Sequence, residues 1–325
     1  MSKQIKFGSC LTSFNSCADR FVRSGYSNGG RDILDMIKEA SKVDELSGIE
    51  LMRTAQITDK NILTLKKVVE DSGLEVCMVL PDIWATAKWG NGSITSSKEK
   101  IRKEGLEEIK KSMDWAVEVN CNAIDVWLGQ DGYDYVFQTD YIRAWQWMAD
   151  GIRECADYRP EIKICIEYKM KEPRKYLFVS TIGKTLQLIE EVNRENVGVL
   201  LDIGHALAAG ENPAESIALL SRKEKLFYLH FNDNYGSWDD DLTAGSIHFF
   251  HLLETVYWLN RIGYNGWHTL DIFPYREDGH KATIESIEWI KKAYSIINRM
   301  DKEKMEEITS NQDWISASTL LREVL

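Results

Sequence analysis

Short apolar runs alternate with longer segments of helical periodicity along the whole chain. The runs lack strict apolar–polar alternation, which is typical of parallel strands that are covered on both faces. We predict eight strands, at residues 5–12, 48–53, 75–81, 123–128, 163–169, 197–202, 226–231 and 267–272. Between them apolar residues recur at intervals of three and four, which predicts helices. We expect these at residues 31–43, 61–73, 98–119, 138–157, 181–194, 213–222, 246–262 and 281–299.

Eight successive strand–helix units are what a (β/α)8 TIM barrel requires. A doubly wound open sheet is the alternative fold, but it usually carries a glycine-rich phosphate loop after its first strand. Here the first strand runs into SCLTSFNSCADRF. We therefore expect an α/β protein with one barrel domain over residues 1–300, a helical extension over residues 301–325 and no nucleotide cofactor.

The composition narrows the classes of partner. A net charge of −11 argues against a nucleic acid, whose phosphates attract a basic face. The chain holds no apolar run of the roughly 18 residues that a membrane span needs, and the N-terminal residues MSKQIKFGSC lack a signal-peptide core. The six cysteines include no C-x-x-C pair, so we expect a reduced, cytoplasmic protein without a membrane partner.

All six histidines lie after residue 204, and the first two follow predicted strands. His205 ends the run VGVLLDIGHA, and His230 lies in LFYLHFND. Each has an acid three residues away, Asp202 before His205 and Asp233 after His230. An imidazole beside a carboxylate at a strand end, found twice, favours a metal site.

Two further predicted strands end on an acid, Glu167 in KICIEYK and Asp271 in WHTLDIFP. The C-terminal ends of barrel strands converge on one face. We therefore expect Glu167, Asp202, His230 and Asp271 to bind one metal ion. An oxygen-rich set suits Mn²⁺ best, with Mg²⁺ or Co²⁺ as alternatives, better than structural zinc. For any one of these residues, a salt bridge or a cap at a strand end is the alternative role.

Three consecutive aspartates, Asp239, Asp240 and Asp241, follow His230 in FNDNYGSWDDDLTAGS. Their mutual repulsion is unfavourable without a cation. We expect Asp239 and Asp241 to join His205 around a second metal ion or a water. The alternative is a solvated turn in which Asp241 or Thr243 caps the next helix.

Four segments carry a family resemblance: IEYKMKEPR, LLDIGHA, LHFNDNYGSWDDDLTAGSIH and TLDIFPYRED. They resemble the rhamnose isomerase type within the xylose isomerase-like superfamily of TIM barrels, which also includes 3-epimerases and endonuclease IV. The resemblance implies the metal ligands named above and a substrate contact for Lys169. Ketose 3-epimerases place a glutamate where this chain has Asp271, and this departure weighs against epimerisation.

Such a site abstracts a proton beside a sugar carbonyl and forms an enediolate. The catalytic residues we expect are Glu167, His205, Lys169 and Asp271. Reprotonation gives an isomer or an epimer, whereas loss of a β substituent gives elimination. The segments VWLGQDGYDYVFQTDY and FPYRED resemble the α subunits of C-glycoside deglycosidases, and the sequence leads us to favour that lyase. The resemblance implies 3-oxo-glycosides of aromatic aglycones as substrates, a small β-type partner subunit and an oligomer.

Several tryptophans follow or end predicted strands and could line a pocket for a flat ligand. They are Trp84, Trp89, Trp127 and Trp238. We expect Trp84, Trp127 and Trp238 to bind substrate together with Asp239, Asp241 and Arg276. An aldose–ketose isomerase or epimerase is the alternative enzyme. A phosphodiester nuclease and a non-catalytic sugar-binding barrel are the alternatives from other classes.

Overall fold

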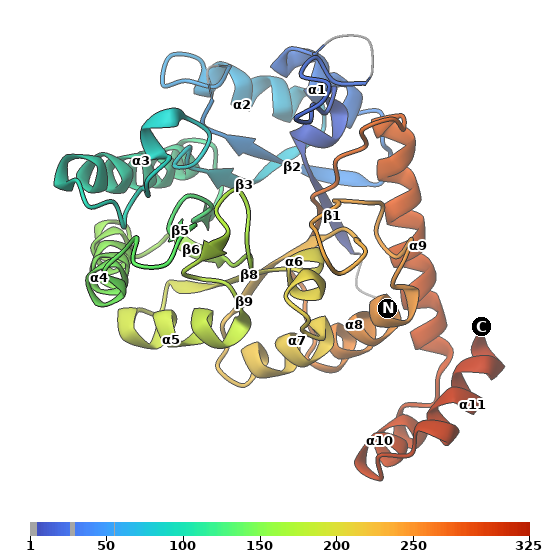
Figure 1. The fold of residues 1–325 in the computed structure, drawn as a ribbon. Coiled ribbons are helices and arrows are strands. Elements are labelled where there is room, and N and C mark those ends of the chain that lie inside the picture. The colour runs from blue at the N-terminus through green and yellow to red at the C-terminus, as the bar shows by residue number, and fades with distance from the viewer. Residues whose placement is uncertain (1–4, 27–29, 55) are drawn as a thin grey trace.

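The eight predicted strands form a closed parallel barrel, which confirms the expected (β/α)8 fold (Figure 1). The computed structural model describes residues 5–26, 30–54 and 56–325. The barrel strands are β1 (Lys6–Cys10), β2 (Leu46–Met52), β3 (Glu75–Leu80), β4 (Ala123–Trp127), β6 (Lys163–Glu167), β8 (Val197–Asp202), β9 (Leu226–Phe231) and β10 (Trp267–Leu270). Each strand pairs with the next one in this series, and β10 pairs with β1.

Helices surround the barrel on its outside (Figure 1). They are α1 (Ile33–Ala40), α2 (Ile62–Asp71), α3 (Glu99–Glu118), α4 (Tyr141–Tyr158), α5 (Ile182–Val192), α7 (Pro213–Ser221), α8 (Phe249–Arg261) and α9 (Gly279–Arg299). Their apolar stripes pack against the outward side chains of the strands and form the main hydrophobic core. All eight predicted helices are present, with ends that differ by a few residues.

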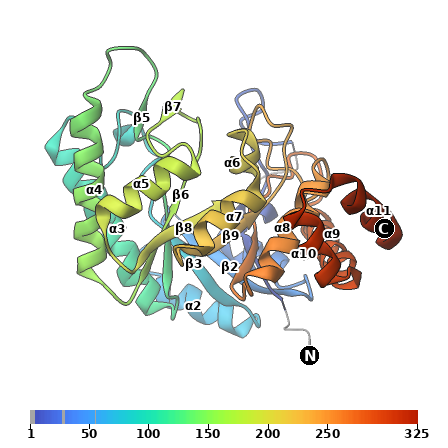
Figure 2. The ribbon, with the colours of Figure 1, turned by 90° about the horizontal axis from the view of Figure 1, so that it is seen from below.

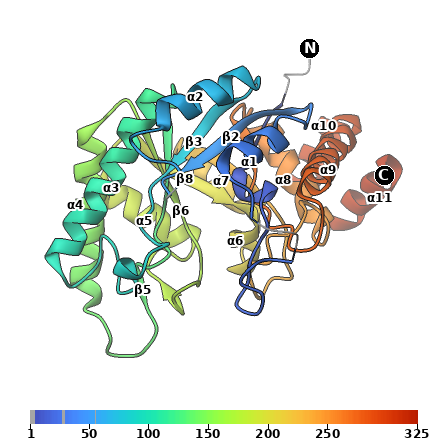
Figure 3. The same ribbon diagram turned by 90° about the horizontal axis from the view of Figure 1, so that it is seen from above.

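Several short elements were not predicted, because they are too short to show a period. The 3-10 helices η1 (Leu11–Phe14) and η2 (Ala87–Trp89) follow β1 and β3. Helix α6 (Ile203–Ala208) follows β8. Strands β5 (Gly132–Tyr133) and β7 (Tyr176–Leu177) pair antiparallel outside the barrel. In the side views, β5, β7 and α6 lie at one end of the barrel (Figures 2 and 3).

The expected C-terminal extension is helical. Helices α10 (Lys302–Ser310) and α11 (Trp314–Val324) form a hairpin beyond α9, outside the ring of barrel helices (Figure 1). In the part of the chain that the structure describes, no helix is long and apolar enough to cross a bilayer. The six cysteines are all buried and unpaired.

Candidate functional site

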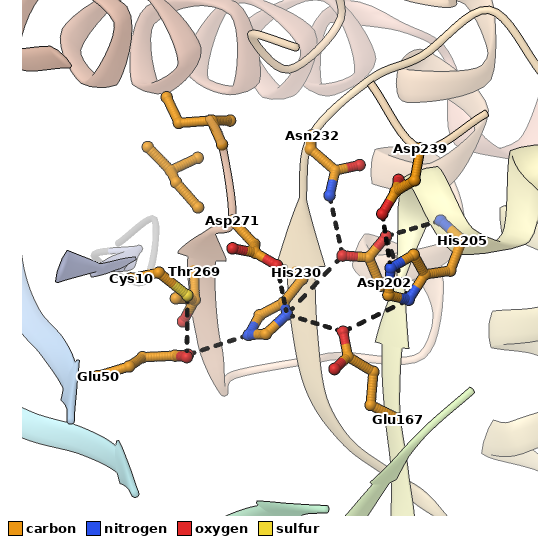
Figure 4. Close-up of polar contacts among 12 residues, drawn as sticks. Cys10, Glu50, Glu167, Asp202, His205, His230, Asn232, Asp239, Thr269 and Asp271 are labelled. Carbon is orange, nitrogen blue, oxygen red and sulfur yellow. Dashed lines mark hydrogen bonds and ion pairs between the residues drawn. The ribbon is translucent and has the colours of Figure 1, made fainter. Parts of the chain in front are cut away.

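Four side chains from adjacent strands meet at the C-terminal end of the barrel (Figure 4). Glu167 and Asp202 are the last residues of β6 and β8, His230 is the last but one of β9, and Asp271 directly follows β10. Their ligand atoms all lie within 4.8 Å of one another. We call these four residues the acidic cluster. The structure thus brings together the four side chains that the sequence indicated as metal ligands.

His230 lies among the three carboxylates of this cluster. Its Nδ1 is 3.2 Å from Oε1 of Glu167, 3.7 Å from Oδ2 of Asp202 and 3.8 Å from Oδ2 of Asp271. The side chains of Glu167, Asp202 and His230 are buried, whereas that of Asp271 is 20% exposed. Asp271 is therefore the member of the cluster that is most open to a ligand from solvent.

The spacing of Asp202 and His205 follows from a helix cap. Asp202 ends β8 and is the N-cap of α6, where its Oδ1 accepts a hydrogen bond from the His205 backbone N–H at 2.7 Å. Its Oδ2 accepts from Asn232 Nδ2 at 2.9 Å. The first turn of α6 then places the His205 ring beside the acidic cluster, with Nδ1 3.4 Å from Oε1 of Glu167. Asp202, His205 and Asp239 form a second group of close ligand atoms.

The three consecutive aspartates point to different places. Asp239 is buried, and its Oδ2 accepts from Lys169 Nζ at 2.8 Å and lies 2.9 Å from His205 Nε2. Asp240 bonds within its own loop, where its Oδ2 accepts from the Tyr235 N–H at 3.0 Å. Burial raises the pKa of Asp241 well above the usual range, and the nearby charges of Asp239 and Asp271 raise it further. Its ligand atoms belong to none of the close groups found in the described residues.

Charges rather than burial decide the protonation of the two site histidines. Burial alone lowers the pKa of His205, but the charges of Asp202, Asp239 and Glu167 outweigh it and raise the pKa to about 9. The pKa of His230 is likewise raised, by Glu50 and Glu167 against the effect of burial. Burial raises the pKa of Asp202 to about 7.

The ionised state of Glu167 and Lys169 is also favoured by their neighbours. Burial raises the pKa of Glu167, but the charges of His205 and His230 outweigh burial and bring the pKa below its usual value. For Lys169 burial also disfavours the charge, but Asp239, Asp241 and Glu172 raise its pKa. The site therefore holds Glu167 as a carboxylate and Lys169 as an ammonium.

The residues fit a divalent cation. The acidic cluster offers carboxylate oxygens and one imidazole nitrogen at converging positions, which is a donor set for a hard metal ion. His205 Nδ1 and Asp239 Oδ1 are buried without a hydrogen-bond partner, and buried polar atoms are rarely left so. A bound ion or water would satisfy them.

Three other residues singled out in the sequence have different roles. Asp233 closes its loop, because its carboxylate accepts from the backbone of Ile247 and His248 at 2.8 Å each. It is thus a structural partner and not a second strand-end ligand. Trp89 is fully buried and donates to the Asp82 carbonyl, so it is a core residue and does not line a pocket. Arg276 is exposed, with its guanidinium 4.1 Å from the Tyr26 ring, and its contact with substrate stays a prediction.

Three other tryptophans were predicted to bind substrate, namely Trp84, Trp127 and Trp238. Trp127 ends β4, pairs in register with Glu167 and meets Trp84 edge to face at 4.8 Å between ring centroids. The Lys169 ammonium is 5.3 Å from the Trp127 ring. Trp238 is 47% exposed, with Lys171 5.7 Å from its ring. Strand register thus brings Trp127 beside Glu167, Trp84 packs on Trp127, and Trp238 directly precedes Asp239 in the chain.

Sequence reasoning missed two acids from the other half of the barrel. Glu50 of β2 and Asp125 of β4 are buried at 3% and 1% exposure. Glu50 contacts His230 directly, with 3.1 Å between Oε1 and Nε2. Each was visible as the one charged residue of an apolar strand, in LSGIELM and AIDVW.

Comparisons with known proteins assign the family. Residues 37–293 match the model of the family described as xylose isomerase-like TIM barrel. The chain belongs to this family. A xylose isomerase from Thermus thermophilus is 25% identical to this xylose isomerase-like barrel in an alignment 276 residues long, which covers 80% of this chain and 71% of that protein.

Solved structures share the fold of this family member. A D-allulose 3-epimerase from Methylomonas sp., in complex with D-allulose, superposes with a TM-score of 0.69 at 17% identity, over 90% of this chain and 98% of that one. A 3-keto-D-glucoside 4-epimerase from E. coli gives a TM-score of 0.66 at 18% identity, over 88% and 99%. A D-tagatose 3-epimerase-like protein gives 0.70 at 21% identity, over 90% and 98%.

Proposed function

We propose that this protein is a divalent-metal-dependent sugar isomerase or epimerase that removes a proton from the carbon beside a carbonyl. The observation that carries the proposal is the convergence of Glu167, Asp202, His230 and Asp271 at the C-terminal end of a barrel of this family. Relatives with this fold include a xylose isomerase and sugar 3-epimerases. The lyase favoured from the sequence becomes the second candidate.

The acidic cluster would hold the metal ion. Its oxygen-rich donors favour Mn²⁺, with Mg²⁺ or Co²⁺ as alternatives. When bound, such an ion polarises a sugar carbonyl and so acidifies the neighbouring C–H. Asp239 and His205 lie next to the cluster and share Asp202 with it, so they would orient a water or a substrate hydroxyl there.

The chain's own residues supply the proton transfer. Glu167 is ionised and can accept the proton as a general base. Lys169 would place its ammonium against the substrate oxygen on which negative charge develops, and Asp239 holds that ammonium at 2.8 Å. Asp271 is the partly exposed acid of the cluster, with its Oδ2 3.8 Å from Nδ1 of His230.

Isomerisation fits this arrangement better than 3-epimerisation. An epimerase needs an acid and a base that reach both faces of one carbon, and the short Asp271 side chain is a poor match for that task. Moving a proton between neighbouring carbons needs only one face. The contact between His205 Nε2 and Asp239 supplies a group that can shuttle a proton there.

A second candidate is a lyase that cleaves the C-glycosidic bond of 3-oxo-glycosides with an aromatic aglycone. Trp127 in register with Glu167, Trp84 packed on it and the half-exposed Trp238 favour it, because flat rings stack on one another. Both candidates share the first proton abstraction. They differ in whether a β substituent then leaves, and the lyase would work with a small partner subunit.

Deuterium exchange tests the shared step. The Mn²⁺-loaded protein is incubated in D2O with a panel of ketoses and aldoses and with a 3-oxo-C-glycoside, and the C–H beside the carbonyl is followed by NMR. Glu167→Gln should slow deuterium uptake by about 100- to 10,000-fold. Glu161→Gln is the matched control, since Glu161 is exposed and pairs with Arg159 ahead of the same strand.

The products separate the two candidates. Isomer or epimer formation from free sugars, without aglycone release, supports the main proposal. Release of the aromatic aglycone without turnover of free sugars refutes the isomerase or epimerase proposal and supports the lyase. Absence of deuterium uptake from every carbonyl compound would refute the shared enolisation step.

A further inference from the structure

Glu50 contacts the imidazole of His230 from the side opposite the acidic cluster (Figure 4). Its Oε1 is 3.1 Å from His230 Nε2, whereas Nδ1 faces Glu167, Asp202 and Asp271 at 3.2 to 3.8 Å. The side chains of Glu50 and His230 are each 1% exposed. Both ring nitrogens are therefore in contact with carboxylates, and the orientation of the ring is fixed from two directions.

A neutral imidazole carries one N–H and one lone pair, so a hydrogen bond at one nitrogen decides which nitrogen can bind a metal ion. Metal-ligating histidines almost always donate their other N–H to a carboxylate, a carbonyl or a water. In this structure the acceptor at Nε2 is Glu50, and the nitrogen left for the metal is Nδ1. Nδ1 is also the nitrogen that lies among three carboxylates.

We infer that Glu50 is a positioning residue for the metal site: it holds His230 in the Nε2–H tautomer, so that the lone pair of Nδ1 points into the acidic cluster. The inference rests on the metal-dependent function proposed above. It adds β2 to a site that was otherwise assigned to β6, β8, β9 and β10.

Cys10 supports the Glu50 carboxylate. The Cys10 thiol at the end of β1 donates to Oε2 of Glu50 at 3.1 Å, so both carboxylate oxygens have a donor. Burial, with the charges of Asp271 and Glu50, raises the pKa of the thiol and keeps it protonated. Cys10, Glu50 and His230 also form a close group of ligand atoms. A cation bound between Cys10, Glu50 and His230 would displace the thiol proton and bind Nε2 of His230. The metal would then be on Nε2 and not on Nδ1, which is the reverse of the arrangement inferred here.

Metal affinity tests the inference without any substrate. We would titrate Mn²⁺ into the wild-type protein and into Glu50→Leu, which removes the acceptor at similar volume. We expect the Mn²⁺ dissociation constant of Glu50→Leu to be about 10- to 100-fold higher than that of the wild type, which is the range for losing a hydrogen-bond partner of a metal ligand. Glu50→Gln keeps an acceptor oxygen and should fall between the two. Glu75→Leu, an exposed acid on the neighbouring strand, is the matched control and should bind as wild type.

The tautomer itself is read by NMR of histidine labelled with ¹⁵N, in wild-type protein loaded with diamagnetic Mg²⁺. His230 is assigned by comparison with His230→Gln. We expect a slowly exchanging Nε2–H and a metal-shifted Nδ1. A resonance pattern with Nδ1–H and a metal-bound Nε2 would overturn the inference, even if Glu50→Leu does not fold.

The outcomes also separate this inference from the proposed function. Equal Mn²⁺ affinities for wild type and a folded Glu50→Leu refute the role of Glu50 and leave the metal-dependent function standing. A wild-type protein that binds neither Mn²⁺ nor Mg²⁺ refutes both.

Discussion

Two buried histidines on neighbouring strands, His230 of β9 and His268 of β10, have opposite environments. Both are buried, at 1% and 3% exposure. His230 points into the barrel among acids, which raise its pKa. His268 points out toward the helices, where it stacks on Phe231 at 5.2 Å and contacts the Tyr294 hydroxyl at 2.7 Å. There burial dominates and lowers its pKa to about 4.

The contrast shows what the barrel does with its two faces. The outward face of a strand meets apolar helix side chains, so a histidine there is neutral and contributes to packing. The inward face at the C-terminal end gathers carboxylates whose repulsion a metal ion would relieve. We therefore expect the inward histidine to control function and the outward one to control stability.

The largest effect is expected from His230→Ala. Removal of this imidazole takes a nitrogen ligand from the acidic cluster, and the Mn²⁺ dissociation constant should rise by more than about 100-fold, beyond the effect of losing an indirect partner. His268→Phe should leave it unchanged. Calorimetric titration of both variants measures this, and comparable losses in the two would remove the functional contrast.

Asp239→Asn should come next. The neutral amide lacks the negative charge of the carboxylate, whose Oδ2 now contacts both Lys169 Nζ and His205 Nε2. Deuterium uptake by the substrate should fall by about 100-fold, in the range of one preorganised electrostatic contact. Asp240→Asn is the control on the adjacent residue, because its carboxylate accepts from the Tyr235 N–H within its own loop. An equal loss in Asp240→Asn would mean that loop structure rather than charge is responsible.

Acid should destabilise the protein through His268. The folded pKa of about 4 lies below the unfolded value of ~6.5, so the unfolded chain binds the proton first as the pH falls. The stability that neutral His268 supplies is complete above the unfolded pKa. Between pH 7 and 4.5 it should decrease by about 2 kcal/mol.

Urea unfolding of wild type and His268→Phe at these two pH values measures this contribution. The variant should lose less stability on acidification than the wild type. If the two lose the same amount, His268 is not the group responsible.

The smallest effect is expected at the edge of the site. Trp238→Ala removes an indole that is half-exposed, so the substrate KM should rise by several-fold, equivalent to about 1 kcal/mol of stacking, while kcat is kept. Steady-state kinetics separates the two parameters. A large fall in kcat would place this residue in the chemistry itself.

The sequence predicted the fold well because the apolar runs and helical periods are strong, and all eight strands are present. It also indicated the acidic cluster, because strand-end acids and histidines stand out in a parallel barrel. It did not reveal Glu50, since a lone acid inside LSGIELM has no local partner, and its contact with His230 spans 180 residues. The position of the Arg276 side chain could not be predicted for the same reason, because loop conformation depends on contacts such as that with Tyr26.

Asp202 has a further consequence through its bond to the backbone of His205. One carboxylate oxygen caps the N-terminus of α6, while the other accepts from Asn232 and faces the acidic cluster. Binding of a metal ion by Asp202 would therefore alter the hydrogen bond that Asp202 accepts from the His205 backbone in the first turn of α6. The exchange rate of the His205 backbone amide hydrogen would therefore report whether a metal ion occupies the site.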